Sequence, residues 1–176
     1  IPIISRAMML AEILRLKYSV TVAGSHGKTT TTSIISSVFE QAGLDPTIIN
    51  GGIINKYNTN AKLGKGDWII AEADESDGSF TSLPSTITLI NNIDPEHLDF
   101  YKNFSSLKKS FLRYALNIPF FGFICISNDD KNIKEILKGL KDRRVISFGL
   151  SKNSNVYSEN VRIILKKNIY YSCFDV

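Results

Sequence analysis

Residues 20–32 read Val-Thr-Val-Ala-Gly-Ser-His-Gly-Lys-Thr-Thr-Thr-Thr, and this stretch decides the fold of the chain. Its β-branched start predicts a strand over residues 19–23, and the pattern after it predicts a helix over residues 28–42. Glycines between the two elements allow a tight turn in which successive backbone N–H groups can point at phosphate oxygens. The helix offers the positive end of its dipole to an anion. This order of elements indicates a phosphate-binding loop.

Two side chains at the end of this loop have the chemistry that a nucleoside triphosphate requires. Lys28 can reach the β- and γ-phosphates as a point charge, and the hydroxyl group of Thr29 can ligate Mg²⁺. The loop is shorter than the common G-x-x-x-x-G-K-[ST] pattern, because Val22 or Thr21 stands where its first glycine belongs. The strand before it and the helix after it still favour a nucleotide site.

The composition is that of an ordinary globular domain. Of 176 residues, 43% are hydrophobic and 22% are charged, which is enough for one domain with its own core. The formal charge of +4 comes from scattered lysines, so we expect no nucleic-acid partner. We also expect no membrane partner, because the sequence shows neither a bilayer-spanning apolar run nor a secretory signal. Cys125 and Cys173 lack metal-site spacing and are expected to be free thiols, which predicts a cytoplasmic protein.

Apolar runs and helical patterns alternate through most of the chain. The alternation predicts a mostly parallel, doubly wound α/β sheet, and two runs near the C-terminus predict an antiparallel pair at a sheet edge. The polar residues 53–67 are expected to form a loop. The helix over 28–42 is expected to bury Ile34, Ile35, Val38, Phe39 and Ala42. The expected strands are 19–23, 47–50, 68–73, 86–91, 120–127, 144–148, 155–164 and 168–174, and the expected helices are 5–17, 28–42, 104–117 and 130–140.

Three polar loops follow three of these strands and should meet at one edge of the sheet, because ligands in open α/β sheets lie beyond the carboxyl ends of strands. The first is the phosphate loop. The second begins at Glu72, the end of a buried strand, where a carboxylate can hold the Mg²⁺ that bridges the terminal phosphates. For the next acids, Glu75 and Asp77, a solvated acidic turn is an equally good interpretation.

The third loop, residues 91–99, contains one of the two histidines of the chain. His97 lies among acidic residues, so it could ligate a second metal ion or steady a transferring phosphoryl group. The alternative is an ordinary surface histidine, with Asp94 or Glu96 only capping the next helix. The other histidine, His26, is expected to orient the phosphate loop rather than to take part in chemistry.

Four motifs, in this order and spacing, resemble the central ATP-binding domain of the Mur ligase family. They are Gly24-Ser-His-Gly-Lys-Thr-Thr-Thr-Thr32, Asn50-Gly-Gly52, Glu72-Ala-Asp-Glu-Ser-Asp77 and Asn92-Ile-Asp-Pro-Glu-His-Leu-Asp99. The resemblance covers essentially the whole chain, and the shortened loop is the form that this family uses. The alanine-adding branch is the most similar, and Ser25 in place of threonine is the main departure within the loop.

The resemblance implies an ATP-dependent ligase of peptidoglycan precursor synthesis. Such an enzyme joins L-alanine to UDP-N-acetylmuramic acid through an acyl phosphate, with ATP and Mg²⁺ bound. Lys28 would offset charge on the moving phosphoryl group, and Thr29 and Glu72 would ligate one Mg²⁺. His97 would ligate a second Mg²⁺ or contact the acyl phosphate, and Asn50 is a weaker candidate for a phosphate-side contact. The phosphates would be held by Gly24, Ser25, His26, Gly27, Lys28, Thr29 and Thr30.

The family has three domains, and the resemblance implies that this chain represents the middle one. Residues 1–18 are expected to be a helical connection from a missing N-terminal UDP-binding domain. Residues 19–176 are expected to form the central ATP-binding domain, incomplete at its C-terminus and without the C-terminal domain. Alone, the chain is expected to bind Mg-ATP weakly, if at all, and not to make the amide.

Other interpretations compete with this one. The nearest is another Mur-type ligase, either a murein tripeptide ligase or a folylpolyglutamate synthetase-like enzyme, although Ser76 and the lack of a tyrosine beside it favour the alanine-adding branch. A P-loop kinase or GTPase is a second, but Asn128-Asp-Asp-Lys131 only imitates the N-K-x-D guanine motif of a GTPase. A nucleotide-binding module without ligase activity is a third, and it would have no use for a metal-binding His97.

Overall fold

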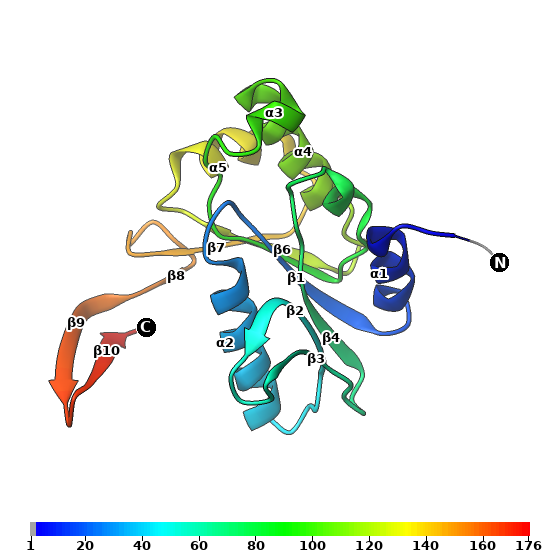
Figure 1. Ribbon diagram of the computed structural model, residues 1–176. Helices are drawn as coiled ribbons and strands as arrows, with labels where there is room; N and C mark the ends of the chain where they lie inside the picture. The colour runs from blue at the N-terminus through cyan, green and yellow to red at the C-terminus, as the bar shows by residue number, and fades with distance from the viewer. Residues whose placement is uncertain (1–2) are drawn as a thin grey trace.

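The computed structural model describes residues 3–176, which form a central sheet with helices on both faces (Figure 1). The large sheet has eight strands in the order β3-β2-β4-β1-β5-β6-β7-β8, and a second sheet pairs β9 with β10. The strands are β1 (Tyr18–Ala23), β2 (Thr47–Ile54), β3 (Thr59–Lys62), β4 (Trp68–Glu72), β5 (Ile87–Ile90), β6 (Phe123–Ser127), β7 (Val145–Gly149), β8 (Val156–Tyr157), β9 (Glu159–Lys166) and β10 (Ile169–Asp175). The helices are α1 (Arg6–Leu14), α2 (Lys28–Gln41), α3 (Leu98–Tyr101), α4 (Phe104–Leu116) and α5 (Lys131–Ile136), with short 3-10 helices η1 (Ser79–Ser82) and η2 (Leu137–Gly139).

Strand β1 lies in the middle of the large sheet. It pairs in parallel with β4 on one side and with β5 on the other, so the loops after these three strands open at the same edge. Each pair of neighbouring strands in the spatial order from β2 to β8 is parallel, and β3 pairs with β2 as an antiparallel edge strand. The predicted mostly parallel, doubly wound α/β sheet is confirmed.

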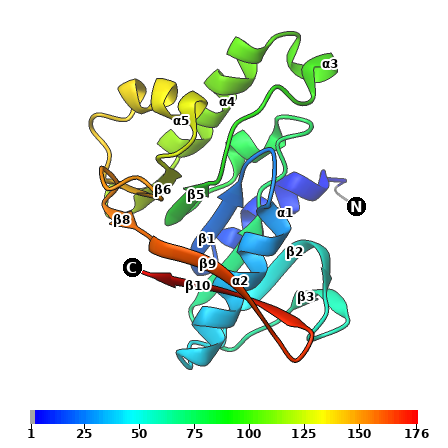
Figure 2. The ribbon, with the colours of Figure 1, turned by 90° about the vertical axis from the view of Figure 1, so that its left-hand side faces the viewer.

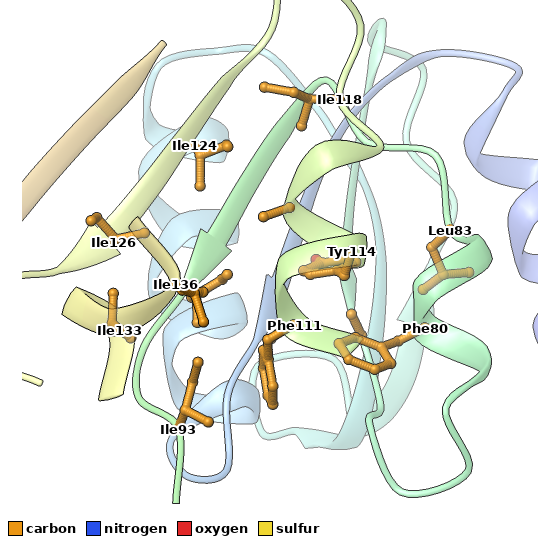
Figure 3. Close-up of a cluster of buried hydrophobic side chains, with 14 of the residues drawn as sticks. Phe80, Leu83, Ile93, Phe111, Tyr114, Ile118, Ile124, Ile126, Ile133 and Ile136 are labelled. Atoms are coloured by element: carbon orange, nitrogen blue, oxygen red, sulfur yellow. The ribbon is translucent and has the colours of Figure 1, made fainter. Parts of the chain in front are cut away.

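The main hydrophobic core lies on the face of the sheet that α1, α4 and α5 cover, while α2 lies on the other face (Figures 1 and 2). Figure 3 shows its centre, where the rings of Phe80, Phe111 and Tyr114 pack together. The hydroxyl group of the fully buried Tyr114 bonds to that of Thr21 in β1. Helix α1 adds Leu14, which is 1% exposed, so the N-terminal helix is part of this core. Within residues 3–176, no helix combines the length and apolar character that crossing a bilayer requires.

Helix α2 does not bury the face that its apolar residues predicted. Ile34 and Val38 are 59% and 61% exposed, whereas the hydroxyl residues Thr32 and Ser36 are buried against the sheet. The prediction for Ile34, Val38 and the exposed Ala42 is therefore wrong. Small side chains let the helix approach the strands closely, and Ser36 satisfies its hydroxyl group by donating to the carbonyl oxygen of Thr32.

The predicted loop over residues 53–67 is also wrong in part. Strand β2 continues to Ile54 and turns back as β3, and Asn58 takes the left-handed conformation in the turn, with a φ of 53°. Glu40 of α2 anchors this hairpin through hydrogen bonds from Lys56, Tyr57 and Lys62. Burial opposes ionisation of this carboxyl, yet these three bonds hold the pKa of Glu40 at about 2.

The C-terminal runs do form an antiparallel pair, but the pair makes a sheet of its own beyond edge strand β8. Figure 1 shows this hairpin standing away from the large sheet. The other predicted elements differ from the observed ones mainly at their ends. For example, β6 begins at Phe123 rather than at residue 120, because Gly122 closes a turn on the carbonyl oxygen of Pro119.

Candidate nucleotide and metal site

The phosphate loop joins the end of β1 to the start of α2, as predicted. Gly24 and Gly27 have φ angles of 144° and 78°, which side chains with a Cβ atom rarely adopt. Gly27 is also the N-cap of α2, which starts at Lys28. The N–H groups of the first helical turn have no partner within the helix, so they are free to bind an anion.

The loop after β5 holds the phosphate loop in place. The amide N–H of His26 donates to the Asn92 side-chain oxygen at 2.8 Å, and the Asn92 side-chain nitrogen donates back to the carbonyl oxygen of His26 at 3.1 Å. The neighbouring Asn91 also donates to that carbonyl oxygen, and the amide of Asp94 donates to the Ser25 hydroxyl group at 2.8 Å. Sequence reasoning missed the role of the two asparagines, although both lie directly after a central strand and Asn92 begins one of the four motifs.

Thr29 and Glu72, the predicted pair of Mg²⁺ ligands, lie in direct contact. The Thr29 hydroxyl group donates to Glu72 Oε2 at 2.9 Å, and the backbone N–H of Gly51 donates to the same oxygen at 2.9 Å. A Cβ atom at Gly51 would lie 2.8 Å from both carboxylate oxygens, and one at Gly52 would lie 3.1 Å from the Thr29 methyl group. The glycines after Asn50 therefore leave room for this hydroxyl–carboxylate pair.

Asn50 itself is 5% exposed and lies against the first turn of α2. Its side-chain nitrogen donates to the Ser33 hydroxyl group at 3.0 Å and to the carbonyl oxygen of Thr29 at 3.4 Å. These bonds tie β2 to the helix that carries Thr29. Its predicted contact with phosphate stays a prediction.

Lys28 shares its ammonium group between the phosphate loop and the loop after β4. Its Nζ atom donates to the carbonyl oxygen of Gly24 at 2.8 Å and lies 2.9 Å from both carboxylate oxygens of Glu75. The Glu75 side chain is 1% exposed, and that of Lys28 is 15% exposed. Of the two interpretations left open for Glu75, the solvated turn is therefore wrong, since this carboxylate is a buried counter-ion of Lys28.

His97 comes to the same place from the third loop. Its Nε2 atom is 3.7 Å from Glu75 Oε1, and ligand atoms of His97, Glu75 and Glu96 all lie within 4.8 Å of one another. His97 has a φ of 54°, and it precedes α3 as its N-cap. The Tyr101 hydroxyl group donates to the Glu75 carbonyl oxygen, and burial together with this acidic surrounding raises the pKa of Tyr101.

His26 and Thr30 lie at the rim of this site. The His26 ring is 60% exposed, with Nε2 at 3.3 Å from Asp94 and Nδ1 at 3.7 Å from Glu96. These contacts agree with an orienting position for His26. The Thr30 side chain lies on the exposed side of α2, so only its backbone is placed for a phosphate contact.

The donor set fits Mg²⁺ next to a triphosphate. Hydroxyl and carboxylate oxygens are the ligands that Mg²⁺ prefers, and Thr29 and Glu72 already hold theirs 2.9 Å apart. His97, Glu75 and Glu96 offer a second set of potential ligand atoms. The structure thus brings together Lys28, Thr29, Glu72 and His97 from the ends of three central strands.

The sequence profile of the Mur ligase middle domain matches residues 22–174. The chain belongs to the Mur ligase family. It is 50% identical over 163 residues to the UDP-N-acetylmuramate–L-alanine ligase of Rhodospirillum rubrum, which covers 93% of this chain and 34% of that protein. The ligase of the same name from Rickettsia bellii is 52% identical over 177 residues, covering 100% of this chain and 36% of that protein.

The Mur ligase fold is also seen in a solved structure. The UDP-N-acetylmuramate:L-alanyl-γ-D-glutamyl-meso-diaminopimelate ligase of Neisseria meningitidis matches with a TM-score of 0.82 over 99% of this chain and 58% of that one. Its sequence identity of 22% supports a shared fold only. The chain spans about a third of the length of the two curated relatives.

Proposed function

We propose that this chain is the nucleotide-binding part of an ATP-dependent ligase that joins L-alanine to UDP-N-acetylmuramic acid in peptidoglycan precursor synthesis. The observation that carries the proposal is the meeting of Lys28, Thr29, Glu72 and His97 at one sheet edge, in a Mur ligase middle domain. Support for the substrates comes from relatives about half identical in sequence that bear this enzyme's name.

In this reaction, a carboxylate oxygen of UDP-N-acetylmuramic acid attacks the γ-phosphorus of ATP, and ADP leaves. The amine nitrogen of L-alanine then attacks the acyl carbon and loses a proton as phosphate leaves. Lys28 and the backbone N–H groups of residues 24–30 bind the β- and γ-phosphates and offset charge as the phosphoryl group moves. The hydrogen bonds from the loop to Asn91 and Asn92, which hold its backbone in one conformation, support this role.

Thr29 and Glu72 would hold one Mg²⁺, and His97 would hold a second or contact the acyl phosphate. When bound, Mg²⁺ neutralises developing charge on the phosphate oxygens. Gly51 orients Glu72 through its N–H group, and Asn50 secures the turn of α2 that carries Thr29. The acids that surround His97 favour a cation there over a direct contact with an anion.

The remaining assignments follow from the family. We propose that residues 19–176 act as the central domain of a longer, cytoplasmic ligase, and that residues 1–18 lead into it. The relatives' greater length supports this assignment. The adjoining domains would supply the sites for the UDP-sugar and the amine.

The test is phosphate release by the full-length protein with Mg-ATP and UDP-N-acetylmuramic acid. L-alanine, glycine, L-serine and the tripeptide L-Ala-γ-D-Glu-meso-diaminopimelate are offered separately, with Lys28→Ala as the control. We expect release that requires L-alanine and is lost in the control. Release with the tripeptide alone would instead assign the protein to the murein tripeptide ligases, and ATP binding without any amine-dependent release would leave only a nucleotide-binding module.

A further inference from the structure

Glu75 is a buried acid at the centre of the site that the proposed mechanism does not use. It is 0% exposed, yet it carries a carboxylate within the phosphate-binding region. Its only close cation among the described residues is Lys28, at 2.9 Å from both oxygens, and its Oε2 atom makes no hydrogen bond of good geometry. A buried carboxylate is expensive to desolvate, so its place here calls for an explanation other than stability.

The surroundings of Glu75 fix its position from several directions. Its carbonyl oxygen accepts hydrogen bonds from the Tyr101 hydroxyl group and from the N–H of Gly78. Its Oε1 atom is 2.9 Å from Nζ of Lys28 and 3.7 Å from Nε2 of His97. Glu75 therefore links the phosphate loop to the loop that carries the histidine.

The geometry also shows what the ammonium group of Lys28 has left to offer. An ammonium group has three donors. One donates to the carbonyl oxygen of Gly24 and one to Glu75, so a single donor remains for a phosphate oxygen. Without the carboxylate, Lys28 would be held at one point only and could rotate away from the loop.

We propose that Glu75 is a positioning residue that aims Lys28 at the transferring phosphoryl group and, at the same time, opposes the binding of nucleotide without metal. The inference rests on the proposed function. The negative charge of Glu75 cancels that of Lys28, so a triphosphate without Mg²⁺ meets no net attraction from this pair. Mg²⁺ held by Thr29 and Glu72 would offset the negative charge of the triphosphate, and the Lys28 donor that Glu75 aims would then act on the moving phosphoryl group.

The proposal predicts opposite effects on two measurements for Glu75→Gln, which keeps the shape of the side chain and removes its charge. ATP should bind at least about tenfold more tightly in EDTA, because a nearby negative charge is gone. The kcat of the full-length enzyme with Mg-ATP should fall by roughly 100-fold, because a neutral amide holds the Lys28 ammonium group less firmly than a carboxylate, and a misplacement of a positioned group by about 1 Å has such an effect. A purely structural role would lower both affinity and kcat.

Glu75→Asp distinguishes the effect of the carboxylate charge from the effect of side-chain length. It keeps the charge and withdraws the carboxylate, so kcat should fall while ATP affinity in EDTA stays within about threefold of the wild type. Glu135→Gln is the matched control, because Glu135 also pairs with a lysine, Lys108, but between α4 and α5, where it contacts none of the site residues named above. It should change neither quantity.

The experiment titrates ATP into the full-length proteins by calorimetry, with EDTA or with Mg²⁺, and measures kcat from phosphate release. Tighter binding in EDTA with a lower kcat for Glu75→Gln supports the proposal. An unchanged kcat, or a parallel loss of affinity and kcat in both Glu75 variants, overturns it. If the wild type binds ATP but shows no amine-dependent release, the proposed ligase function fails, and the EDTA titration still decides the role of Glu75.

Discussion

Replacing Gly51 by alanine should weaken the Mg²⁺ site while leaving the fold intact. The new Cβ atom would lie 2.8 Å from both carboxylate oxygens of Glu72, and ordinary contact begins at 3.4 Å, so the carboxylate must retreat by roughly 0.6 Å. The atoms that move are the far end of a flexible side chain, so the backbone can stay where it is. The movement separates Glu72 from Thr29, whose oxygens are 2.9 Å apart.

The expected magnitude follows from the position of Gly51 behind a metal ligand. Changes to groups that orient a ligand reduce metal affinity or activity by about 10- to 100-fold, and we expect the lower end because Glu72 keeps its charge. The Mg²⁺ concentration for half-maximal phosphate release should therefore rise about tenfold. The melting temperature should change little.

The assay is a Mg²⁺ titration of phosphate release by the full-length enzyme at saturating ATP, with thermal unfolding measured alongside. Gly43→Ala is the control. Its Cβ atom would meet nothing within 4 Å, but its φ of 74° costs an alanine about 1 kcal/mol of stability. This variant should melt earlier and keep its Mg²⁺ dependence. An unchanged Mg²⁺ requirement in Gly51→Ala would refute the reasoning.

Three further predictions concern other parts of the structure. Gly66→Ala places a Cβ atom 1.8 Å from the carbonyl oxygen of Leu44, so its free energy of unfolding in urea should fall by more than about 2 kcal/mol, and a wild-type value would contradict this close approach. Asn92→Ala removes the acceptor for the His26 N–H, so the dissociation constant for Mg-ATP should rise about tenfold in calorimetry; unchanged affinity would mean that the clamp is dispensable. The pKa of Glu40 is lowered from 4.5 to about 2, so its stabilisation is present above pH 4.5 and is lost as the pH falls toward 2. In urea unfolding, the free energy of unfolding of Glu40→Gln should fall less than that of the wild type as the pH is lowered. An equally steep fall in both proteins would exclude Glu40 as its source.

The sheet and the phosphate loop could be predicted from the sequence because both depend on residues that are close together in the chain. A strand, two glycines, Lys28 and Thr29 lie within a dozen residues, and their geometry follows from neighbours in the chain. The alternation of strands and helices then places the following loops at the same edge. Glu72 could be found by this logic alone.

The buried face of α2 could not be predicted, because two sets of residues have the spacing that places side chains on one face of a helix. Ile34 and Val38 are four residues apart, and so are Thr32 and Ser36. Apolar character favours the first pair, but close packing against the sheet favours the second, whose side chains are smaller and of which Ser36 donates its hydroxyl group to the carbonyl oxygen of Thr32. The distance between helix and sheet is set by tertiary packing and leaves no local signal.

The roles of Glu75 and Asn92 are likewise long-range properties. Glu75 pairs with a lysine 47 positions earlier in the chain, and Asn92 bonds to a histidine 66 positions earlier. Each residue looks like part of a polar turn until the sheet brings its partner near. Whether an acid in such a turn is solvated or buried depends on contacts that spacing alone does not reveal.

The central position of β1 also determines whether local unfolding of the protein can disrupt the nucleotide site. Strands in the middle of a sheet exchange their amide hydrogens only in nearly global unfolding, whereas edges and projecting hairpins fray at little cost. The strands behind the phosphate loop and Glu72 are β1 and β4, while β9 and β10 project beyond the far edge. Proteolytic nicking in that hairpin should therefore leave β1, β4 and the phosphate loop folded, and their geometry should persist until the large sheet itself unfolds.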